Sequence, residues 1–441
     1  MKRNMFKRTV SLCLTLVLLL MLAPAASAAN YTIKQVEGGK KMSFFVTQDG
    51  DMYVSGNNSC NILDGVSTGY DSGAGSCAMR PQFMTDNVAM VAADRLASSS
   101  EINHALILKN DGKLYGLGSN VMYQLGFAEK GRYGSMQYIM DDVKYIACGW
   151  KDSAAITTNG DLYWWGRNVV SEPSLVATNV KQVECGVDHT VILKEDGSVW
   201  VRGVARLSAL GDGRTSGSSE EFIHVMDGCV DISAGDQFTV ALKANGDLYG
   251  WGCNQCGQLG VSSTLKDSYG MYYVPYPTFI TSKVKEVECT NDTTYLIKTD
   301  NSLYGIGNNY DSQLGNASGK NAATPTWLAG NVAQVSAGVN AALILKTNGS
   351  TYGCGNNYWY QIGAGFSQYN VGTWQPAGFT ASPVFDGEVS FSDVEESSYC
   401  YDSVSWAVER YITNGTSATT LAPNATCTRG QIVTFLYRAM G

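Results

Sequence analysis

The chain has 441 residues, of which 44% are hydrophobic and 25 are tyrosine; this is enough for a large packed core in two or three domains of roughly 100–200 residues each. Charged residues are 16% and prolines number nine, which disfavours low-complexity disorder. The 31 basic and 39 acidic residues give a net charge of −8, which argues against a nucleic-acid partner. The 48 glycines are about 11% of the chain against a usual ~7% and favour short strands and tight turns.

The first 28 residues have the organisation of a secretory signal peptide. Basic residues within the first eight positions precede an apolar run at 10–23 and a small-residue stretch that ends at Ala28. An uncleaved membrane anchor is the alternative, but the apolar run is shorter than the ~20 residues that span a bilayer. We therefore predict a signal peptide at 1–28, export, and no membrane span.

Cleavage after Ala28 changes both the charge and the cysteine count. It removes four basic residues and no acidic one, which leaves 27 against 39 and a net charge of −12. It also leaves 11 of the 12 cysteines, so at least one stays free or pairs between chains.

An octet with the pattern Asp/Asn-Gly-x-x-Tyr/Trp-x-x-Gly recurs about every 50 residues. Its copies lie at 49–56, 111–118, 159–166, 196–203, 245–252, 300–307 and 348–355, and only the sixth departs from the pattern. Asp-Gly and Asn-Gly pairs predict a type I′ hairpin turn, in which both residues have positive φ. In the sixth copy Asn301 replaces the glycine, and Asn tolerates that conformation.

The segments around each octet are also repeated. Apolar strands precede it, as at 180–186 and 190–194, and a Gln-Leu-Gly turn follows it, as at 124–126 and 258–260. A unit of three or four strands cannot bury both of its faces, so seven units must pack together and close into a ring. We predict an all-β, seven-bladed β-propeller at 29–385, in which the last glycine of each octet lets neighbouring backbones approach closely.

These repeats resemble those of the regulator of chromosome condensation family. The shared pattern runs strand, Gly-x-x-His, apolar strand, Asp-Gly-x-x-Tyr-x-x-Gly and Gln-Leu-Gly, with the histidine present at His104 and His189. The resemblance implies a seven-bladed propeller. It also raises the guanine-nucleotide exchange activity of the family's eukaryotic namesake as an alternative function.

The chain from about residue 386 changes to helical patterns at 401–410 and 428–438. Together with Phe391-Ser-Asp-Val and Pro423-Asn, these segments resemble a single S-layer homology module, a small all-α domain at 386–441. The resemblance implies anchoring to secondary cell-wall polysaccharide of a Gram-positive-type bacterium. It places Thr428, Arg429 and Gln431 in the wall-glycan-binding motif, where Arg429 suits an acidic sugar; a purely local pairing of Arg429 is the alternative.

The sequence offers little for catalysis or metal binding. Only three histidines are present, and no protease, hydrolase or nucleotide-binding motif occurs. Cys148, Cys185 and Cys289 share one repeat position, occupied elsewhere by small residues such as Ser100, which predicts a tight site near the propeller axis. No carboxylate pair is repeated or positioned for catalysis. We therefore predict no catalytic residue, no metal and no cofactor.

Aromatic residues outside the expected strands are the candidates for partner binding. They are Tyr272, Tyr273, Tyr276, Tyr358, Trp359, Tyr360 and Trp374, all expected in inter-strand loops. Aromatics in loops on a rigid scaffold are typical binding anchors, although packing between blades would also use them. The sequence thus predicts a secreted, non-enzymatic cell-surface protein whose propeller recognises a protein or a glycan.

Overall fold

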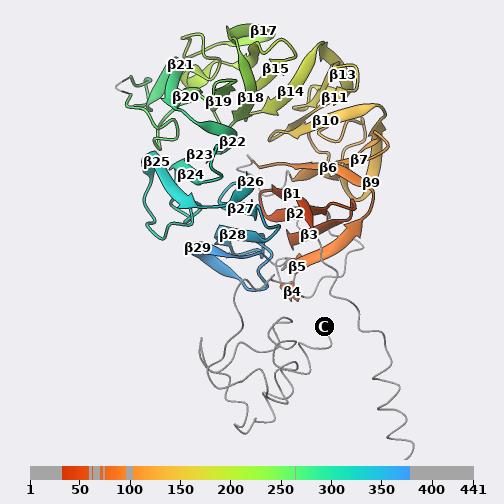
Figure 1. The fold of residues 1–441 in the computed structure, drawn as a ribbon. Helices are drawn as coiled ribbons and strands as arrows, with labels where there is room; N and C mark the ends of the chain where they lie inside the picture. The colour runs from red at the N-terminus through yellow and green to blue at the C-terminus, as the bar shows by residue number, and fades with distance from the viewer. Residues whose placement is uncertain are drawn as a thin grey trace, which may run out of the picture. The chain divides into compact units, whose positions relative to one another are not determined.

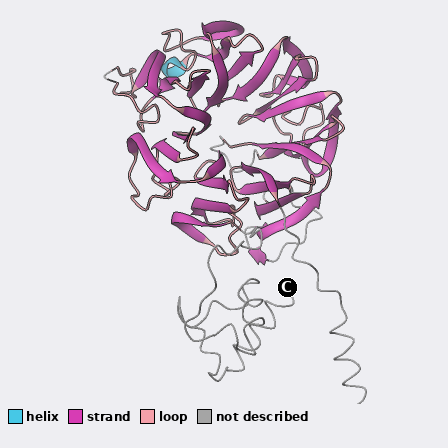
Figure 2. Ribbon diagram, in the orientation of Figure 1, coloured by secondary structure: helices cyan, strands magenta, loops and turns pink. Residues whose placement is uncertain are grey.

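The computed structural model describes residues 32–58, 62, 70–72, 75–95, 103–263 and 265–377. These residues form seven antiparallel sheets arranged around a common axis, as Figure 1 shows, which confirms the predicted seven-bladed propeller. Strands account for nearly all the regular structure, and the described part of the chain contains no α-helix (Figure 2). The predicted signal peptide, the helical module and its residues Thr428, Arg429 and Gln431 lie outside the described residues.

Each blade is built from consecutive strands, so no blade combines distant parts of the sequence. The first three blades are β1(Ile33–Gly38), β2(Met42–Thr47), β3(Met52–Asn57), β4(Tyr70–Ser72) and β5(Gly75–Thr85); β6(Val88–Ala93), β7(His104–Lys109), β8(Leu114–Ser119) and β9(Arg132–Met140); and β10(Val143–Cys148), β11(Asp152–Thr157), β12(Leu162–Gly166) and β13(Val170–Ala177). The fourth and fifth are β14(Val180–Cys185), β15(His189–Lys194), β16(Val199–Val204) and β17(Ser218–Met226), with a 3-10 turn η1(Arg206–Ser208); and β18(Cys229–Ala234), β19(Phe238–Lys243), β20(Leu248–Cys253) and β21(Tyr273–Thr281). The last two are β22(Val284–Thr290), β23(Thr293–Lys298), β24(Leu303–Gly307) and β25(Ala322–Ala329); and β26(Val332–Ala337), β27(Ala341–Lys346), β28(Thr351–Asn357) and β29(Gln368–Pro376).

The octet forms the hairpin between the second and third strands of each blade, but its turn is not type I′. In the third blade, Gly160 N–H donates to Thr157 O at 2.9 Å and only Gly160 is left-handed, with φ of 85°. None of the seven Asp or Asn residues before this position has a positive φ. The loop is therefore a three-residue turn followed by a left-handed residue, the G1-bulge hairpin. Asn301, with φ of 65°, takes the glycine position as predicted.

The Asp or Asn of the octet has a different role from the one expected. In five of the seven octets its side chain accepts a hydrogen bond from the backbone N–H two residues later, as Asp196 does from Ser198 at 2.9 Å and Asp300 from Ser302 at 2.9 Å. This Asx turn stabilises the hairpin through the side chain. In the first and third blades, the hydroxyls of Thr47 and Thr157 accept the equivalent N–H. The prediction of a hairpin is confirmed, and the prediction of its turn type is wrong.

The last glycine of the octet faces the start of the second strand. At Gly166, with φ of 113°, an added Cβ would lie 2.4 Å from Lys151 O. Only glycine fits there, which confirms the predicted close approach. The end of the third strand can therefore lie directly against the start of the second strand.

The Gln-Leu-Gly segment and the asparagine before it form the loop between the third and fourth strands. Asn120 Oδ1 accepts the Leu125 N–H at 2.8 Å, and Asn254 and Leu259 repeat this bond at 3.0 Å. The leucines are fully buried. This loop and the loop between the first two strands emerge at one face of the propeller, because consecutive strands are antiparallel; we call it the loop face.

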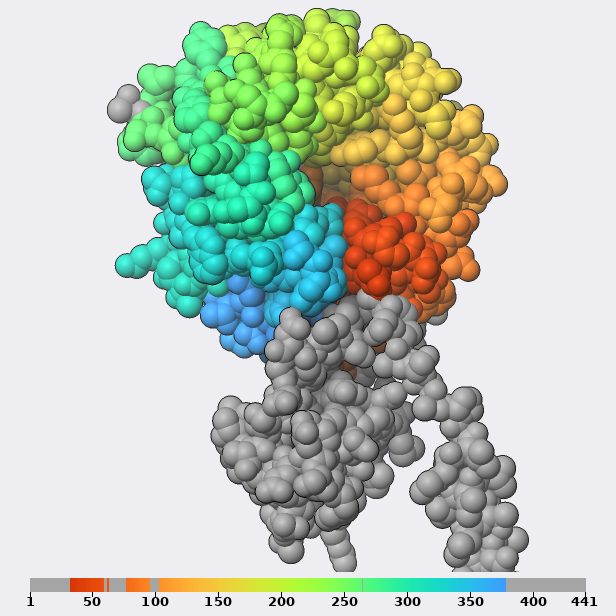
Figure 3. All heavy atoms as spheres, viewed as in Figure 1, coloured from red at the N-terminus to blue at the C-terminus, as the bar shows by residue number. Residues whose placement is uncertain are grey.

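The ring closes between β1 and β26 by the same contact that joins other blades. Gln35 pairs with both backbone groups of Val91 in the next blade, and Gln182 does the same with Ile232. At the closing seam, Gln334 Oε1 accepts the Val36 N–H at 2.9 Å. Figure 3 shows the first and last blades meeting at this seam. Between the innermost strands of neighbouring blades, side-chain amides thus form the hydrogen bonds to the backbone that a neighbouring strand would form within one sheet.

Candidate functional site

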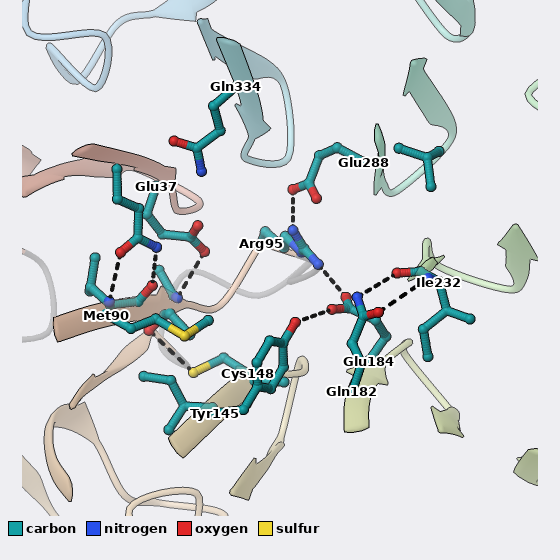
Figure 4. A pocket seen from close by; sticks show the side chains of 17 residues that line it. Glu37, Met90, Arg95, Tyr145, Cys148, Gln182, Glu184, Ile232, Glu288 and Gln334 are labelled. Carbon is teal, nitrogen blue, oxygen red and sulfur yellow. Dashed lines mark hydrogen bonds and ion pairs between the residues drawn. The ribbon is translucent and has the colours of Figure 1, made fainter. Parts of the chain in front are cut away.

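Three glutamates point toward the propeller axis from the same register position. Glu37, Glu184 and Glu288 are each the fifth residue of an innermost strand, β1, β14 and β22 respectively. The pocket that they line has a volume of about 150 Å³ and also contains Tyr145 and Gln182. Figure 4 shows these side chains converging from different blades.

Arg95, in the segment after β6, places its guanidinium among these carboxylates. Its Nη2 donates to Glu184 Oε2 at 2.6 Å and its Nη1 pairs with Glu288 Oε1. Tyr145 donates its hydroxyl to Glu184 Oε1 at 3.2 Å, and Glu37 accepts from the Ala93 N–H at 3.2 Å. Because Arg95 already takes up two carboxylates, the cluster ties the second, fourth and sixth blades together across the axis.

Burial dominates the ionisation of this cluster. Burial raises the pKa of Glu37 to about 7 and that of Glu288 to about 8, although Arg95 acts to lower both. Burial likewise raises the pKa of Glu184. Burial opposes the charge on Arg95, but the attraction of Glu288 and Glu184 raises its pKa well above the usual value. Near neutral pH the axis therefore holds the permanent cation of Arg95 beside Glu37 and Glu288, which are only partly ionised.

This cluster was not predicted from the sequence. The prediction that no carboxylate pair is repeated is wrong, because Glu37, Glu184 and Glu288 share one register position. The sequence pattern that could have predicted them is their position immediately before the small residue at the end of the innermost strand. Arg95 carried no such signal, since it follows β6 in an insertion that breaks the repeat spacing.

Because of the same insertion, one of the predicted small residues of the repeat was assigned to the wrong position. Ala93 ends β6 where Cys148 ends β10, so Ala93 and not Ser100 is the small residue of the second blade. Cys148, Cys185 and Cys289 are buried free thiols at these inner strand ends. The described residues contain no group of three or more His, Cys, Asp or Glu side chains that could hold a metal ion.

His104 and His189 pack between blades. Each is 1% exposed, with Nε2 of His104 2.9 Å from Ser153 Oγ and Nε2 of His189 3.0 Å from Thr239 Oγ1. Burial lowers the pKa of both to about 3, so both rings are neutral. The repeat-family histidine therefore acts here as a packing residue with one hydrogen bond to the next blade.

The predicted binding aromatics of the fifth blade lie in different environments. Tyr273 and Tyr276 lie on β21 and not in a loop, which corrects the sequence expectation. Tyr273 packs against the core, whereas Tyr276 is 58% exposed and its ring lies beside Gly213 of the preceding blade. Tyr272, just before the strand, lies under Lys266 Nζ, 4.4 Å from its ring centroid.

In the seventh blade, Tyr358, Trp359 and Tyr360 lie in the predicted loop between β28 and β29. Tyr358 is 53% exposed and its ring meets that of Trp359 edge to face at 4.8 Å. Tyr360 holds the left-handed position of the turn, with φ of 61°. Tyr358 and Trp359 line a pocket of about 150 Å³ on the loop face.

Trp374 does not share this loop. It lies on β29 and packs against the hydrophobic cluster of the last two blades, with its ring over Gly315. Trp165 and Trp251 pack over Gly126 and Gly211 in the same way. Trp374 is therefore an inter-blade packing residue, the alternative that the sequence had left open.

Comparison with known protein families gives three matches. Regulator of chromosome condensation (RCC1) repeat models match residues 180–204 and 229–258, and 245–297. An S-layer homology domain model matches residues 390–433, the segment that contains Thr428, Arg429 and Gln431. The chain carries RCC1 repeats and an S-layer homology domain. The repeats cover parts of the fourth to sixth blades of the propeller.

Relatives of the RCC1-repeat propeller have diverse names. The chain is 29% identical over 241 residues to the Ultraviolet-B receptor UVR8 of Arabidopsis thaliana, covering 48% of this chain and 53% of the receptor. It is 26% identical over 329 residues to the human E3 ubiquitin-protein ligase HERC2, covering 67% of this chain and 6% of the ligase. The chain thus spans about half of the first relative and a small part of the second.

A solved structure supports the fold of the RCC1-repeat propeller. Yeast RCC1 (Prp20), crystallised with Kap60, superposes with a TM-score of 0.64 at 19% identity, covering 81% of this chain and 87% of that one. The S-layer homology domain indicates association with the bacterial cell surface through cell-wall polysaccharide. Within the described ranges, no helix has the length and apolar character needed to cross a bilayer.

Proposed function

We propose that this protein is an exported, non-catalytic binding protein of the bacterial cell surface. Its S-layer homology domain holds it to secondary cell-wall polysaccharide, and its propeller presents aromatic side chains that recognise a protein or a glycan. The observation that carries the proposal is the presence of that domain, at 390–433, in one chain with a propeller that exposes Tyr358 beside a pocket.

The structural features that favour binding over catalysis are on the propeller. Arg95 occupies the axial carboxylates, so Glu184 and Glu288 are engaged in ion pairs. By contrast, Tyr358 and Tyr369 expose more than half of their surface at the loop-face pocket. Exposed aromatics on a rigid sheet scaffold supply binding energy with little loss of conformational entropy.

Anchoring is tested with the mature full-length chain and native wall sacculi. We expect the chain to sediment with sacculi and to stay in solution when the secondary polysaccharide has been stripped. Arg429→Ala should weaken sedimentation, because the guanidinium pairs bidentately with a carboxylate of the glycan. Arg438→Ala removes the same charge outside the matched segment and serves as the control.

Recognition by the propeller is tested by cross-linking on intact cells followed by identification of the partner. Recovery of the protein in the cell-wall fraction with a surface partner supports the proposal. Recovery in the cytoplasm with a small GTPase would instead favour the alternative, nucleotide exchange. Equal sedimentation of wild type and Arg429→Ala with native sacculi, or undiminished sedimentation with stripped sacculi, would contradict the anchoring role.

A further inference from the structure

The loop-face pocket lies where the ring closes, between the seventh and first blades. Its residues come from the β1–β2 loop, the β26–β27 loop, the end of β28, the β28–β29 loop and β29. They are Lys40, Lys41, Val339, Asn340, Asn356, Tyr358, Trp359, Gln361 and Tyr369. Its volume of about 150 Å³ is below the ~300–1,000 Å³ of sites for drug-sized ligands, so it suits one ring-sized group.

Aromatic rings form the walls of this pocket. Tyr358 and Tyr369 are 53% and 59% exposed, and Trp359 stands at 89° to the Tyr358 ring. The face of an aromatic ring is apolar and carries partial negative charge, so it attracts C–H groups with partial positive charge. A pyranose ring presents such C–H groups on its flat face.

The aromatic loop is held in place by two amide side chains. Asn356 Oδ1 accepts the Tyr358 N–H at 3.1 Å and the Gln361 Nε2–H at 3.2 Å. Gln361 Oε1 accepts the Trp359 N–H at 2.9 Å. The loop is thereby pre-organised, which lowers the entropy lost on binding. Asn340, from the β26–β27 loop, also lines the pocket and carries an amide of the kind that bonds hydroxyl groups.

The charge of the pocket is opposite to that of the chain. Lys41 Nζ lies 4.9 Å from the Trp359 ring centroid, and no acidic side chain is among the described residues that line the pocket. The whole sequence has a net charge of −8, and the axial pocket collects three carboxylates. A ligand carboxylate here would meet a lysine held beside an aromatic wall.

We propose that this pocket binds an acidic sugar residue, a pyranose that carries a carboxylate, within an anionic polysaccharide. The sugar ring packs against Tyr358 and Trp359, and its carboxylate pairs with Lys41. An acidic peptide would satisfy Lys41 equally well, but flat apolar walls beside an amide match a hydroxylated ring better. This inference rests on the proposed surface location and names the ligand class of the propeller.

The test uses the mature full-length chain with Arg429→Ala, which weakens the contribution of the S-layer homology domain to binding. The probes are tetragalacturonate, its methyl ester, which keeps the rings but loses the charge, and a tetraglutamate peptide. Calorimetry measures the affinity for each probe. We expect tetragalacturonate to bind, the methyl ester to bind more weakly, and the peptide not to bind.

Two variants separate charge from stacking. Lys41→Gln should weaken tetragalacturonate binding by roughly tenfold and leave the methyl ester unaffected, because only the charged contact is lost. Trp359→Ala should weaken both sugars; circular dichroism checks that it folds. Lys151→Gln is the matched control, because Lys151 also precedes a second strand and lies over a tryptophan ring, Trp150, at 3.4 Å.

Absence of tetragalacturonate binding, or binding that Lys41→Gln leaves unchanged, would overturn the saccharide proposal. Binding of tetraglutamate alone would assign the pocket to an acidic peptide. Either result leaves the surface-binding function standing, because sedimentation and cross-linking measure it independently. If Lys41→Gln and Lys151→Gln weaken tetragalacturonate binding to the same extent, the effect of charge is non-specific, and this outcome would contradict the proposed site.

Discussion

Arg95 and Glu184 form an ion pair of 2.6 Å across the propeller axis, although they belong to the second and fourth blades. Both side chains are nearly buried, with 11% and 9% of their surface exposed. The pair therefore connects two blades that are not neighbours in the ring. Its removal should affect the whole ring and not one sheet.

Replacing Arg95 with alanine should lower the free energy of unfolding by about 3–5 kcal/mol at neutral pH, because buried carboxylates lose their counter-charge. Chemical denaturation followed by tryptophan fluorescence measures the loss. Arg214→Ala is the control, since Arg214 pairs with Asp212 at the surface and is 44% exposed. A surface pair of this kind contributes about 0–1 kcal/mol, so equal losses for both variants would contradict a structural role for the axial pair.

The raised carboxyl pKa values predict that the stability contributed by Glu37 and Glu288 falls as pH rises from about 4.5 to about 8. Glu37 and Glu288 have pKa values of about 7 and 8 in the folded state against 4.5 unfolded. The stability that these carboxyls contribute in their protonated form is fully present below pH 4.5 and is lost as pH rises through 7–8. Urea midpoints measured from pH 6.5 to 9 should decrease up to about pH 8 and then level off, and the double variant E37Q/E288Q should flatten that decrease. An unchanged slope in the double variant would falsify this assignment.

The two buried histidines predict the opposite trend in acid. His104 and His189 have pKa values of about 3 when folded against 6.5 unfolded, so the unfolded chain takes up protons that the folded chain does not. Their contribution to stability is lost as pH falls from 6.5 toward 3. His189→Asn should reduce the acid sensitivity of the urea midpoint, and an unchanged pH profile of the midpoint would contradict this role.

The sixth hairpin offers a test of backbone strain. Asn301 occupies the left-handed position, with φ of 65°, that glycine holds in the other six octets. Asn301→Ala should cost about 1–2 kcal/mol, because a Cβ without a local hydrogen bond is disfavoured there. Asn301→Gly should be close to neutral. Thermal denaturation of the pair measures the difference, and equal stability would show that the turn relaxes to another conformation.

The closing seam can be tested through Gln334. Gln334→Ala removes the acceptor of the Val36 N–H and should cost about 1–3 kcal/mol. Hydrogen exchange should then accelerate at β1 more than at β14. Gln137→Ala is the control, because Gln137 on β9 donates within its own strand, to Ser135. Uniform exchange across the ring would indicate that Gln334 does not hold the seam.

The repeated parts of the fold were predictable from the sequence, because local turn chemistry and strand patterning recur in register. The octet located every hairpin, and Asn301 was correctly placed at the left-handed position. The turn type was not predictable, since an Asp-Gly pair fits both a type I′ turn and a G1-bulge hairpin. The decisive contact, from Asp or Asn to the N–H two residues on, is visible only in three dimensions.

The non-repeated parts account for the errors at the candidate sites. Tyr273, Tyr276 and Trp374 were expected in loops because the fourth strands vary in length and sequence between blades. Arg95 reaches the axis from an insertion, so repeat alignment gave it no structural equivalent. Contacts across the ring, such as Arg95 with Glu288, depend on closure and leave no local pattern.

Each blade of this propeller is a single uninterrupted stretch of chain, and the seam at β1 and β26 uses the glutamine contact found at other blade boundaries. The position of the chain ends within the ring is therefore structurally arbitrary. A circular permutant that joins Pro376 to Ile33 through a short linker and opens the chain between β13 and β14 would keep every sheet intact. Whole blades are consequently the natural units by which such a chain can be cut, duplicated or recombined.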